Sequence, residues 1–270
     1  MLIRFVRHLL LAVQFFTRLP ITGKLAEWVG YSSTMLRDSA AHFPAIGWLV
    51  GALSALVFAG TAYALPALPA SPWVAAVLST AFSALLTGAF HEDGLADTAD
   101  GLGGGMTRER ALDIMKDSRI GTYGSVALLL AVVGKLSLLV LLYQLDIVWS
   151  VAGLFAAHVT SRLMPLFLIR AMAHVGDTQQ SKSKPLADTI KTATLFVGLL
   201  WWVAAMILTA YVFPLLPLLA GTLGALVCTV GMAWRLYKRL EGFTGDGLGA
   251  TQQLSEIGFY LGLVIAAGIA

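Results

Sequence analysis

Seven apolar stretches, separated by short polar connections, follow one another along this chain. Each is close to the roughly 20 residues that a helix needs to cross a bilayer. Pro214 and Pro217 divide the uncharged segment 193–234, because proline interrupts a helix. The candidate spans are Phe43–Leu65, Pro72–Phe90, Gly124–Tyr143, Ile147–Ile169, Ala193–Phe213, Pro214–Trp234 and Leu254–Ala270. The pattern predicts an all-α, polytopic transmembrane helical bundle of about seven spans, in a single domain covering residues 1–270.

The segment Met1–Pro20 has basic residues followed by an apolar run, as a signal peptide does. It lacks a small-residue cleavage site, and Arg18 interrupts the apolar run. We therefore expect an amphipathic N-terminal helix at the membrane surface, with Arg4 and Arg7 near lipid headgroups.

Composition agrees with a membrane location. Apolar residues make up 58% of the 270 positions and charged residues only 12%, about half the charged share of soluble domains. The mean hydropathy is +0.80. The single cysteine, Cys228, excludes an intramolecular disulfide. We expect the lipid bilayer as surroundings and no nucleic-acid partner, and both a monomer and a homo-oligomer stay open.

Basic residues indicate the orientation. Sixteen of the eighteen Lys and Arg residues precede the first span or lie in every second connection after it, and the other connections carry none. The positive-inside rule places the basic connections in the cytoplasm. The exceptions, Lys135 and Arg162, fall within predicted spans. Arg162 lies one helical turn after His158, so we expect a polar stripe that faces the interior of the bundle.

An acidic motif follows the second predicted span, in the sequence from His91 to Gly105. Asp93, Asp97 and Asp100 are spaced i, i+4 and i+7, which places them on one face of a helix. Oxygen ligands in such an arrangement suit Mg²⁺, which also binds substrate phosphates. A solvated acidic loop is the alternative. The helical spacing and the small residues between the carboxylates favour a metal site.

Two further segments carry candidate chemistry on the same side of the membrane. Glu109 and Asp113 fit an amphipathic surface helix, whereas Asp117-Ser118-Arg119 ends at a glycine turn, where an arginine can bind phosphate. Near the carboxyl end, Asp246 lies between two glycines, which let a backbone approach a ligand closely. The Gly-Asp-Gly motif alone is weak evidence for a functional site. Its position on the same side of the membrane as the acidic motif strengthens that evidence.

These motifs together resemble the cobalamin synthase family, the adenosylcobinamide-GDP ribazoletransferases. The resemblance is carried by residues 91–102, by Glu109-Arg110 and by residues 114–122. Residues 17–20, Phe43-Pro44 and residues 244–250 are similar too, so the resemblance covers nearly the whole chain. Glu92 departs from the family pattern, which has an apolar residue such as leucine there.

The resemblance implies an Mg²⁺-dependent step of cobalamin biosynthesis at the bacterial inner membrane, with the active site facing the cytoplasm. A ribosyl hydroxyl of α-ribazole, or of its 5′-phosphate, would attack the cobinamide-side phosphorus of adenosylcobinamide-GDP and release GMP. In this reading the metal ligands are Asp93, Asp97 and Asp100. The catalytic candidates are Asp117, Asp246 and His91, and the substrate-binding candidates are Arg119, Ser118, Arg110 and Lys116.

Two other classes compete with this reading. A CDP-alcohol phosphotransferase-like enzyme also uses a spaced aspartate motif, but that pattern has Ala-Arg after its Asp-Gly opening, whereas here Ala96 precedes Asp97. A divalent-cation transporter would place its carboxylates near the membrane midplane. Here the acidic motif falls in a basic connection, so a transporter is the less favoured alternative.

Overall fold

The computed structural model describes residues 2–176 and 190–268, and within these ranges its regular structure is helical apart from an isolated bridge between His174 and Phe243. The all-α prediction is therefore confirmed. Lys182 and Lys184, two of the sixteen basic residues that the sequence assigns to cytoplasmic connections, lie outside the described residues.

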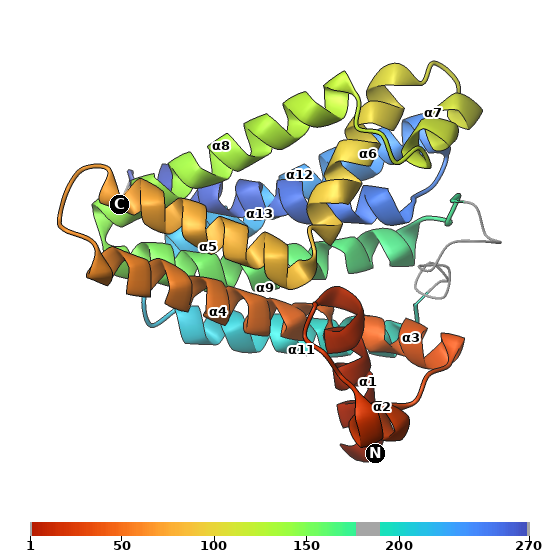
Figure 1. The fold of residues 1–270 in the computed structure, drawn as a ribbon, viewed down its shortest axis with the longest axis horizontal. Helices are drawn as coiled ribbons and strands as arrows, with labels where there is room; N and C mark the ends of the chain where they lie inside the picture. Colours follow the sequence, from red (N-terminus) through yellow and green to blue (C-terminus); the bar gives the residue numbers. More distant parts are fainter. Residues whose placement is uncertain (1, 177–189, 269–270) are drawn as a thin grey trace.

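Long helices lie side by side along the longest axis of the molecule (Figure 1). They are α4 (Phe43–Ala64), α5 (Ser71–Thr87), α8 (Thr122–Leu145), α9 (Ile147–Ala171), α11 (Thr192–Thr209), α12 (Leu215–Leu240) and α13 (Gly245–Ala267). At the right-hand end in Figure 1 lie the shorter α3 (Ser33–Ser39), α6 (Phe90–Gly104) and α7 (Arg108–Met115). The acidic motif and most of the basic connections are thus gathered at one end of the bundle.

Five of the described helices are long and apolar enough to cross a membrane, namely α4 with the short helices before it, α8, α9, α11 and α12. The pair α5 and α6 adds a sixth candidate, although the two helices meet at 89°. The prediction of about seven spans is thus close, and the chain is a multi-pass membrane protein. The last predicted span, Leu254–Ala270, belongs to α13, whose first half carries polar residues and which is not among the five.

The break between α5 and α6 comes from two consecutive left-handed residues, Gly88 (φ 70°) and Ala89 (φ 55°). The predicted span Pro72–Phe90 therefore ends at Thr87, and α6 runs across the end of the bundle. Because α5 lies along the long helices and α6 crosses the end of the bundle (Figure 1), α5 is the membrane-crossing part of this pair and α6 lies outside the spans.

Helix α9 is the central helix of the bundle, with most of its length buried among the others. Gly47 and Gly51 let α4 approach it closely, since a Cβ atom on Gly47 would lie 2.6 Å from the Cα of Val159. These glycines form a small-residue packing face of the kind that brings membrane helices together. The positions of the site residues depend on this closely packed core.

The N-terminal helix α1 (Leu2–Phe16) is amphipathic, as predicted, with one face buried against the bundle. The two arginines expected at lipid headgroups have protein partners. Arg7 Nε donates to the carbonyl oxygen of Val29, at 2.8 Å, and Arg4 lies 3.6 Å from the carboxylate of Asp38. These contacts hold α1 to α2 (Gly23–Val29) and α3 at the same end of the molecule as α6.

Candidate functional site

The candidate site is built where α6 crosses the first turn of α13. Gly94 faces Gly249 across this crossing, and a Cβ atom on Gly94 would lie 2.8 Å from the backbone oxygen of Asp246 and 3.2 Å from the Cα of Gly249. A side chain there would force the helices apart, so the contact requires glycine. The crossing places the acidic face of α6 next to Asp246.

The carboxylates of Asp93, Asp97 and Asp246 lie near this crossing, close enough for their charges to interact. Burial and the negative charges of Asp246, Asp93 and Asp100 raise the pKa of Asp97 to about 7. Burial, and then the charge of Asp93, raises the pKa of Asp246 to about 6. Carboxylates that repel one another in this way bind a cation or a proton readily. The sequence predicted Asp93 and Asp97 as one face, and the structure adds Asp246 from a distant segment.

Asp100 has a different role in the structure. Its two carboxylate oxygens accept hydrogen bonds from the backbone N–H groups of Gly121, at 2.7 Å, and Gly124, at 2.9 Å. These groups belong to the first turn of α8, where backbone donors lack partners within the helix. Asp100, predicted as a metal ligand, therefore joins α6 to α8. The glycine turn before α8 was the only sequence signal of this contact.

Arg239 fixes the other end of α6. From α12, its Nη1 donates to the backbone oxygen of Leu102, at 2.8 Å, and its Nη2 donates to that of Gly105. These carbonyl groups end α6 and have no partner in the next turn. In the sequence Arg239 is one more basic residue in a basic connection, and nothing there indicates this role.

Asp117 and Arg119 lie between α7 and α8 and pair with each other. Arg119 Nε lies 2.9 Å from Oδ1 of Asp117, and a second guanidinium nitrogen contacts Oδ2. The hydrogen bonds from Arg119 lower the pKa of Asp117 to about 2. A carboxyl that stays ionised at such low pH is a weak proton acceptor, which argues against Asp117 as the general base. The predicted substrate-binding residues Ser118, Arg110 and Lys116 are exposed near this pair.

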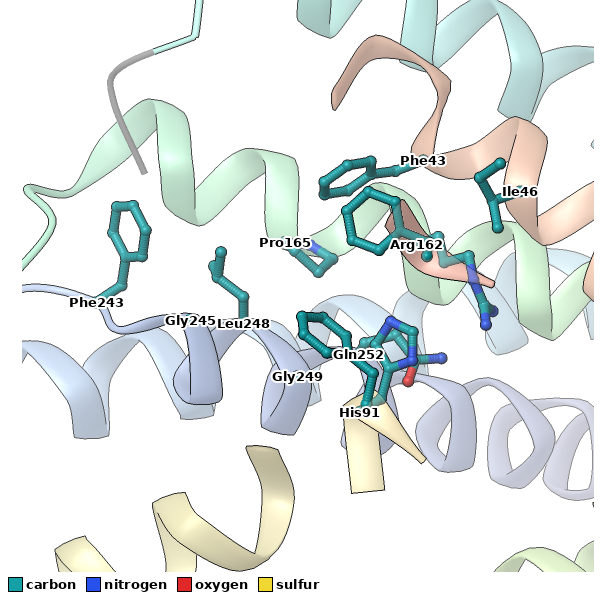
Figure 2. A pocket seen from close by; sticks show the side chains of 12 residues that line it. Phe43, Ile46, His91, Arg162, Pro165, Phe243, Gly245, Leu248, Gly249 and Gln252 are labelled. Atoms are coloured by element: carbon teal, nitrogen blue, oxygen red, sulfur yellow. The ribbon is translucent and has the colours of Figure 1, made fainter. Parts of the chain in front are cut away.

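His91 is buried at the start of α6, and it lines a cavity with Arg162, Phe43 and Gln252 (Figure 2). Burial, and then the charge of Arg162, lowers its pKa well below the ordinary value for histidine, so the ring is neutral. The neighbouring Glu92 accepts a hydrogen bond from the side chain of Gln253, at 3.2 Å. That contact gives the departure from the family pattern at Glu92 a structural reason.

A polar cluster continues from Glu92 into the bundle. Lys135 Nζ lies 2.5 Å from Glu256, and Glu256 lies 3.5 Å from Nδ1 of His158. Arg162 donates to the same ring nitrogen at 3.0 Å. The polar stripe predicted for His158 and Arg162 is thus confirmed. Its partners on α8 and α13 could not be inferred from the sequence.

The described residues contain no group of three His, Cys, Asp or Glu side chains placed to hold a metal ion by themselves. Mg²⁺ usually keeps several waters and binds through one or two carboxylates together with substrate phosphates. Asp93, Asp97 and Asp246 offer the right donor chemistry for such a shared site, in which the substrate completes the ligand set.

Comparison with known proteins gives a consistent result. A family model described as "Cobalamin-5-phosphate synthase" matches residues 8–264. Two relatives named adenosylcobinamide-GDP ribazoletransferase come from Polaromonas sp. (50% identical, covering 97% of this chain and 98% of the relative) and Albidiferax ferrireducens (51% identical, covering 97% and 99%). A third, from Vibrio cholerae, is 44% identical and covers 93% of this chain and 91% of the relative. No solved structure matches the chain.

The two kinds of carboxylate on α6 should respond oppositely to removal of their charge. We expect Asp100→Ala to lower the free energy of unfolding by about 1 kcal/mol or more, because it leaves two backbone donors of α8 without their acceptor. Asp97→Asn should leave stability at pH 8 unchanged or raised, because it removes a carboxylate whose ionised form the fold disfavours. Thermal unfolding in detergent measures both. Equal destabilisation by the two variants would contradict the roles assigned here.

Proposed function

The chain belongs to the cobalamin-5-phosphate synthase family, and we propose that the crossing of α6 and α13 is its active site. As an adenosylcobinamide-GDP ribazoletransferase, the protein joins adenosylcobinamide-GDP to α-ribazole in the final step of cobalamin synthesis. The ribosyl hydroxyl forms the new bond to phosphorus, the bond to GMP breaks, and the hydroxyl proton goes to a base. The ribosyl hydroxyl belongs to α-ribazole or to its 5′-phosphate.

One observation carries the placement of the site. Close contact at Gly94 brings Asp97 and Asp246 together from distant segments, and both carboxyls have raised pKa values. Perturbed carboxyls that gather in one place are typical of functional sites rather than of surface charge. No other acidic group in the described chain combines raised pKa values with such a forced approach.

We propose that Asp93, Asp97 and Asp246 hold Mg²⁺ together with the pyrophosphate of adenosylcobinamide-GDP. A bound ion would neutralise charge on the phosphates and on the departing GMP. Asp100 is left out of this ligand set, because its oxygens hold the start of α8. Asp100 still adds negative charge beside Asp97 and so strengthens the attraction for a cation.

Asp246 is the better placed candidate for the base that accepts the hydroxyl proton, because a carboxylate can bind the ion through one oxygen and take the proton on the other. Its pKa of about 6 holds before an ion binds, and a bound ion would lower it. Asp117, with its pKa near 2, accepts a proton far less readily. The neutral ring of His91, in the first turn of α6, could orient the α-ribazole substrate by hydrogen bonding.

Arg119 is proposed to contact substrate phosphate. Its Nε and Nη2 donate to Asp117, which leaves Nη1 to contact a phosphate oxygen. Arg110, Lys116 and Ser118 are exposed on the same short segment. Their charges should raise the local concentration of the anionic substrate.

The direct test of the function uses the purified protein in detergent with adenosylcobinamide-GDP, α-ribazole and Mg²⁺. Release of GMP that requires both substrates supports the proposal, and release without α-ribazole, or none at all, contradicts it. Proteoliposomes exclude the transporter alternative, because the enzyme should release GMP without moving divalent cations across the bilayer.

Asp97→Asn should reduce turnover by at least ~100-fold, since metal-assisted stabilisation of charge contributes several kcal/mol to such reactions. The matched control is Asp113→Asn, which removes an exposed carboxylate from α7 and should change little. GMP release at saturating Mg²⁺ is the measurement. Similar, near-wild-type rates for both variants would rule out Asp97 as a metal ligand.

The pH dependence should reveal competition between protons and metal. Below pH 7 Asp97 takes up a proton and loses its capacity to bind a cation, so activity should fall as the pH drops through this range. Raising Mg²⁺ should move this acid limb to lower pH. We expect rate–pH profiles at two Mg²⁺ concentrations to differ in the wild type. Superimposable profiles would argue against a shared metal site.

We propose that the site end of the bundle faces the cytoplasm of a bacterial inner membrane. The turns at the opposite end, around Leu68, Asp146 and Pro214, carry no Lys or Arg. In a Cys228→Ser background, an impermeant thiol reagent added to spheroplasts should label Leu68→Cys but not Met106→Cys. Both positions are exposed, at 59% and 91%. The reverse labelling pattern would overturn the orientation.

A further inference from the structure

Arg18 is a cation near the candidate site to which neither the sequence motifs nor the proposed mechanism assign a role. It follows the end of α1, and its backbone N–H donates to the carbonyl oxygen of Leu86 in the last turn of α5, at 2.7 Å. The preceding Thr17 is buried, and its hydroxyl donates to the carbonyl oxygen of Val13, at 2.7 Å, and accepts from the N–H of Leu19. These contacts fix the backbone of Arg18 beside the corner at which α5 gives way to α6.

The guanidinium group of Arg18 lies over Gly88, the first of the two left-handed residues at that corner. A Cβ atom on Gly88 would lie only 2.7 Å from Cζ and from Nη2 of Arg18, and it would overlap Nε. No side chain can therefore occupy this position while the guanidinium stays where it is. The absence of a side chain at Gly88 thus determines where the positive charge of Arg18 lies.

This guanidinium has its hydrogen-bond donors available. Arg18 is exposed, and within residues 2–176 and 190–268 its side chain forms no hydrogen bond or ion pair. By contrast, Arg4 and Arg119 each pair with a carboxylate. An arginine carries its N–H donors in a planar fork that matches two oxygens of a phosphate. Arg18 is therefore suited to bind an oxyanion.

The corner beside Arg18 leads directly into the acidic face of α6. The N–H of Asp93 donates to the carbonyl oxygen of Ala89, at 2.9 Å, so Asp93 lies one helical turn, about 5.4 Å along the axis, beyond the corner. Helical side chains tilt toward the N-terminus of their helix, which directs the carboxylate of Asp93 back toward the corner. An anion that bridges Arg18 and an ion at Asp93 would have to span only a short distance.

The start of α13 lies near the same corner. Phe16, which precedes Arg18 by two residues, meets the ring of Phe90 edge to face, with centroids 6.0 Å apart. Both rings line the small cavity that is also lined by Gly245, the residue before Asp246. Arg18 is therefore at the edge of the crossing where the carboxylates gather.

The charge balance of the proposed site requires a cation at this edge. Three ionised carboxylates and one Mg²⁺ together carry a net negative charge, which would repel an anionic pyrophosphate. Arg119 lies close to Gly121, whose N–H bonds to Asp100 in the second half of α6. Arg18 lies beside the first residues of the same helix. The two arginines therefore flank the acidic face of α6 from opposite ends.

We propose that Arg18 binds a phosphate group of the pyrophosphate in adenosylcobinamide-GDP, an inference that rests on the proposed function. Its guanidinium donates to oxygens of that phosphate and offsets negative charge that the carboxylates and their ion leave unbalanced. The contact also orients the pyrophosphate along α6. A lipid headgroup offers the same phosphate chemistry, and the experiment distinguishes the two sources.

The test compares Arg18→Gln with Arg4→Gln, which removes the same charge from the opposite end of α1. Both are assayed in non-ionic detergent without lipid. We expect Arg18→Gln to lower kcat/KM for adenosylcobinamide-GDP by at least ~10-fold, because hydrogen bonds between charged groups are strong, and to leave the KM for α-ribazole unchanged. Arg18→Lys should give an intermediate value, since it keeps the charge and loses the planar fork. Arg4→Gln should behave like the wild type.

Two outcomes of this comparison would overturn the proposal. In the first, Arg18→Gln and Arg4→Gln have equal kcat/KM values for adenosylcobinamide-GDP. In the second, Arg18→Gln matches the wild type in detergent and is defective only in vesicles that contain phosphatidylglycerol. The second result would assign Arg18 to a lipid headgroup.

A measurement on the wild type keeps the proposal testable if Arg18→Gln does not fold. Phenylglyoxal modifies exposed arginines, and mass spectrometry locates each modified position. Adenosylcobinamide-GDP with Mg²⁺ should protect Arg18 from modification and leave the exposed Arg4 unprotected. Equal modification of Arg18 with and without the substrate would overturn the assignment. Failure of the wild type to release GMP would instead contradict the proposed function, so the two failures are distinguishable.

Discussion

The site depends on one backbone contact, the approach of α6 to α13 at Gly94 and Gly249. A single methyl group on Gly94 would strike the carbonyl of Asp246, so the distance between the two acidic segments is set by the lack of side chains. Burial at this crossing, and then neighbouring carboxylates, raise the pKa values of both groups, with Asp246 acting on Asp97 and Asp93 acting on Asp246. The electrostatic character of the site is thus a consequence of helix packing.

The rest of the fold holds α6 in this position. Left-handed residues at Gly88 and Ala89 turn it away from α5, Asp100 ties it to α8, and Arg239 holds its final carbonyl groups. Each contact satisfies backbone groups that would otherwise lack partners at a helix end. Asp100 and Arg239 therefore position α6 and, with it, the proposed site. The sequence suggests Asp100 only as a metal ligand and Arg239 only as a basic residue that indicates orientation.

The spans and the acidic face of α6 could be predicted from the sequence, because both follow from local periodicity and composition. Asp100 shares the spacing of Asp93 and Asp97, yet its role differs because the amides it caps come from a separate helix. Asp97 and Asp246 come from segments that are far apart in the chain. The same is true of the four phenylalanines around the cavity beside His91, namely Phe16, Phe43, Phe90 and Phe243. Such contacts depend on tertiary packing, which spacing along the sequence does not contain.

The central claim, that Asp97 and Asp246 form one site, is tested most directly by a double-mutant cycle. Binding of Mn²⁺, as a paramagnetic substitute for Mg²⁺, is measured in the presence of adenosylcobinamide-GDP for the wild type, Asp97→Asn, Asp246→Asn and the double variant. If both carboxylates hold the same ion, the double variant should bind about as weakly as the weaker single variant. Independent losses, which multiply in the double variant, would contradict the account.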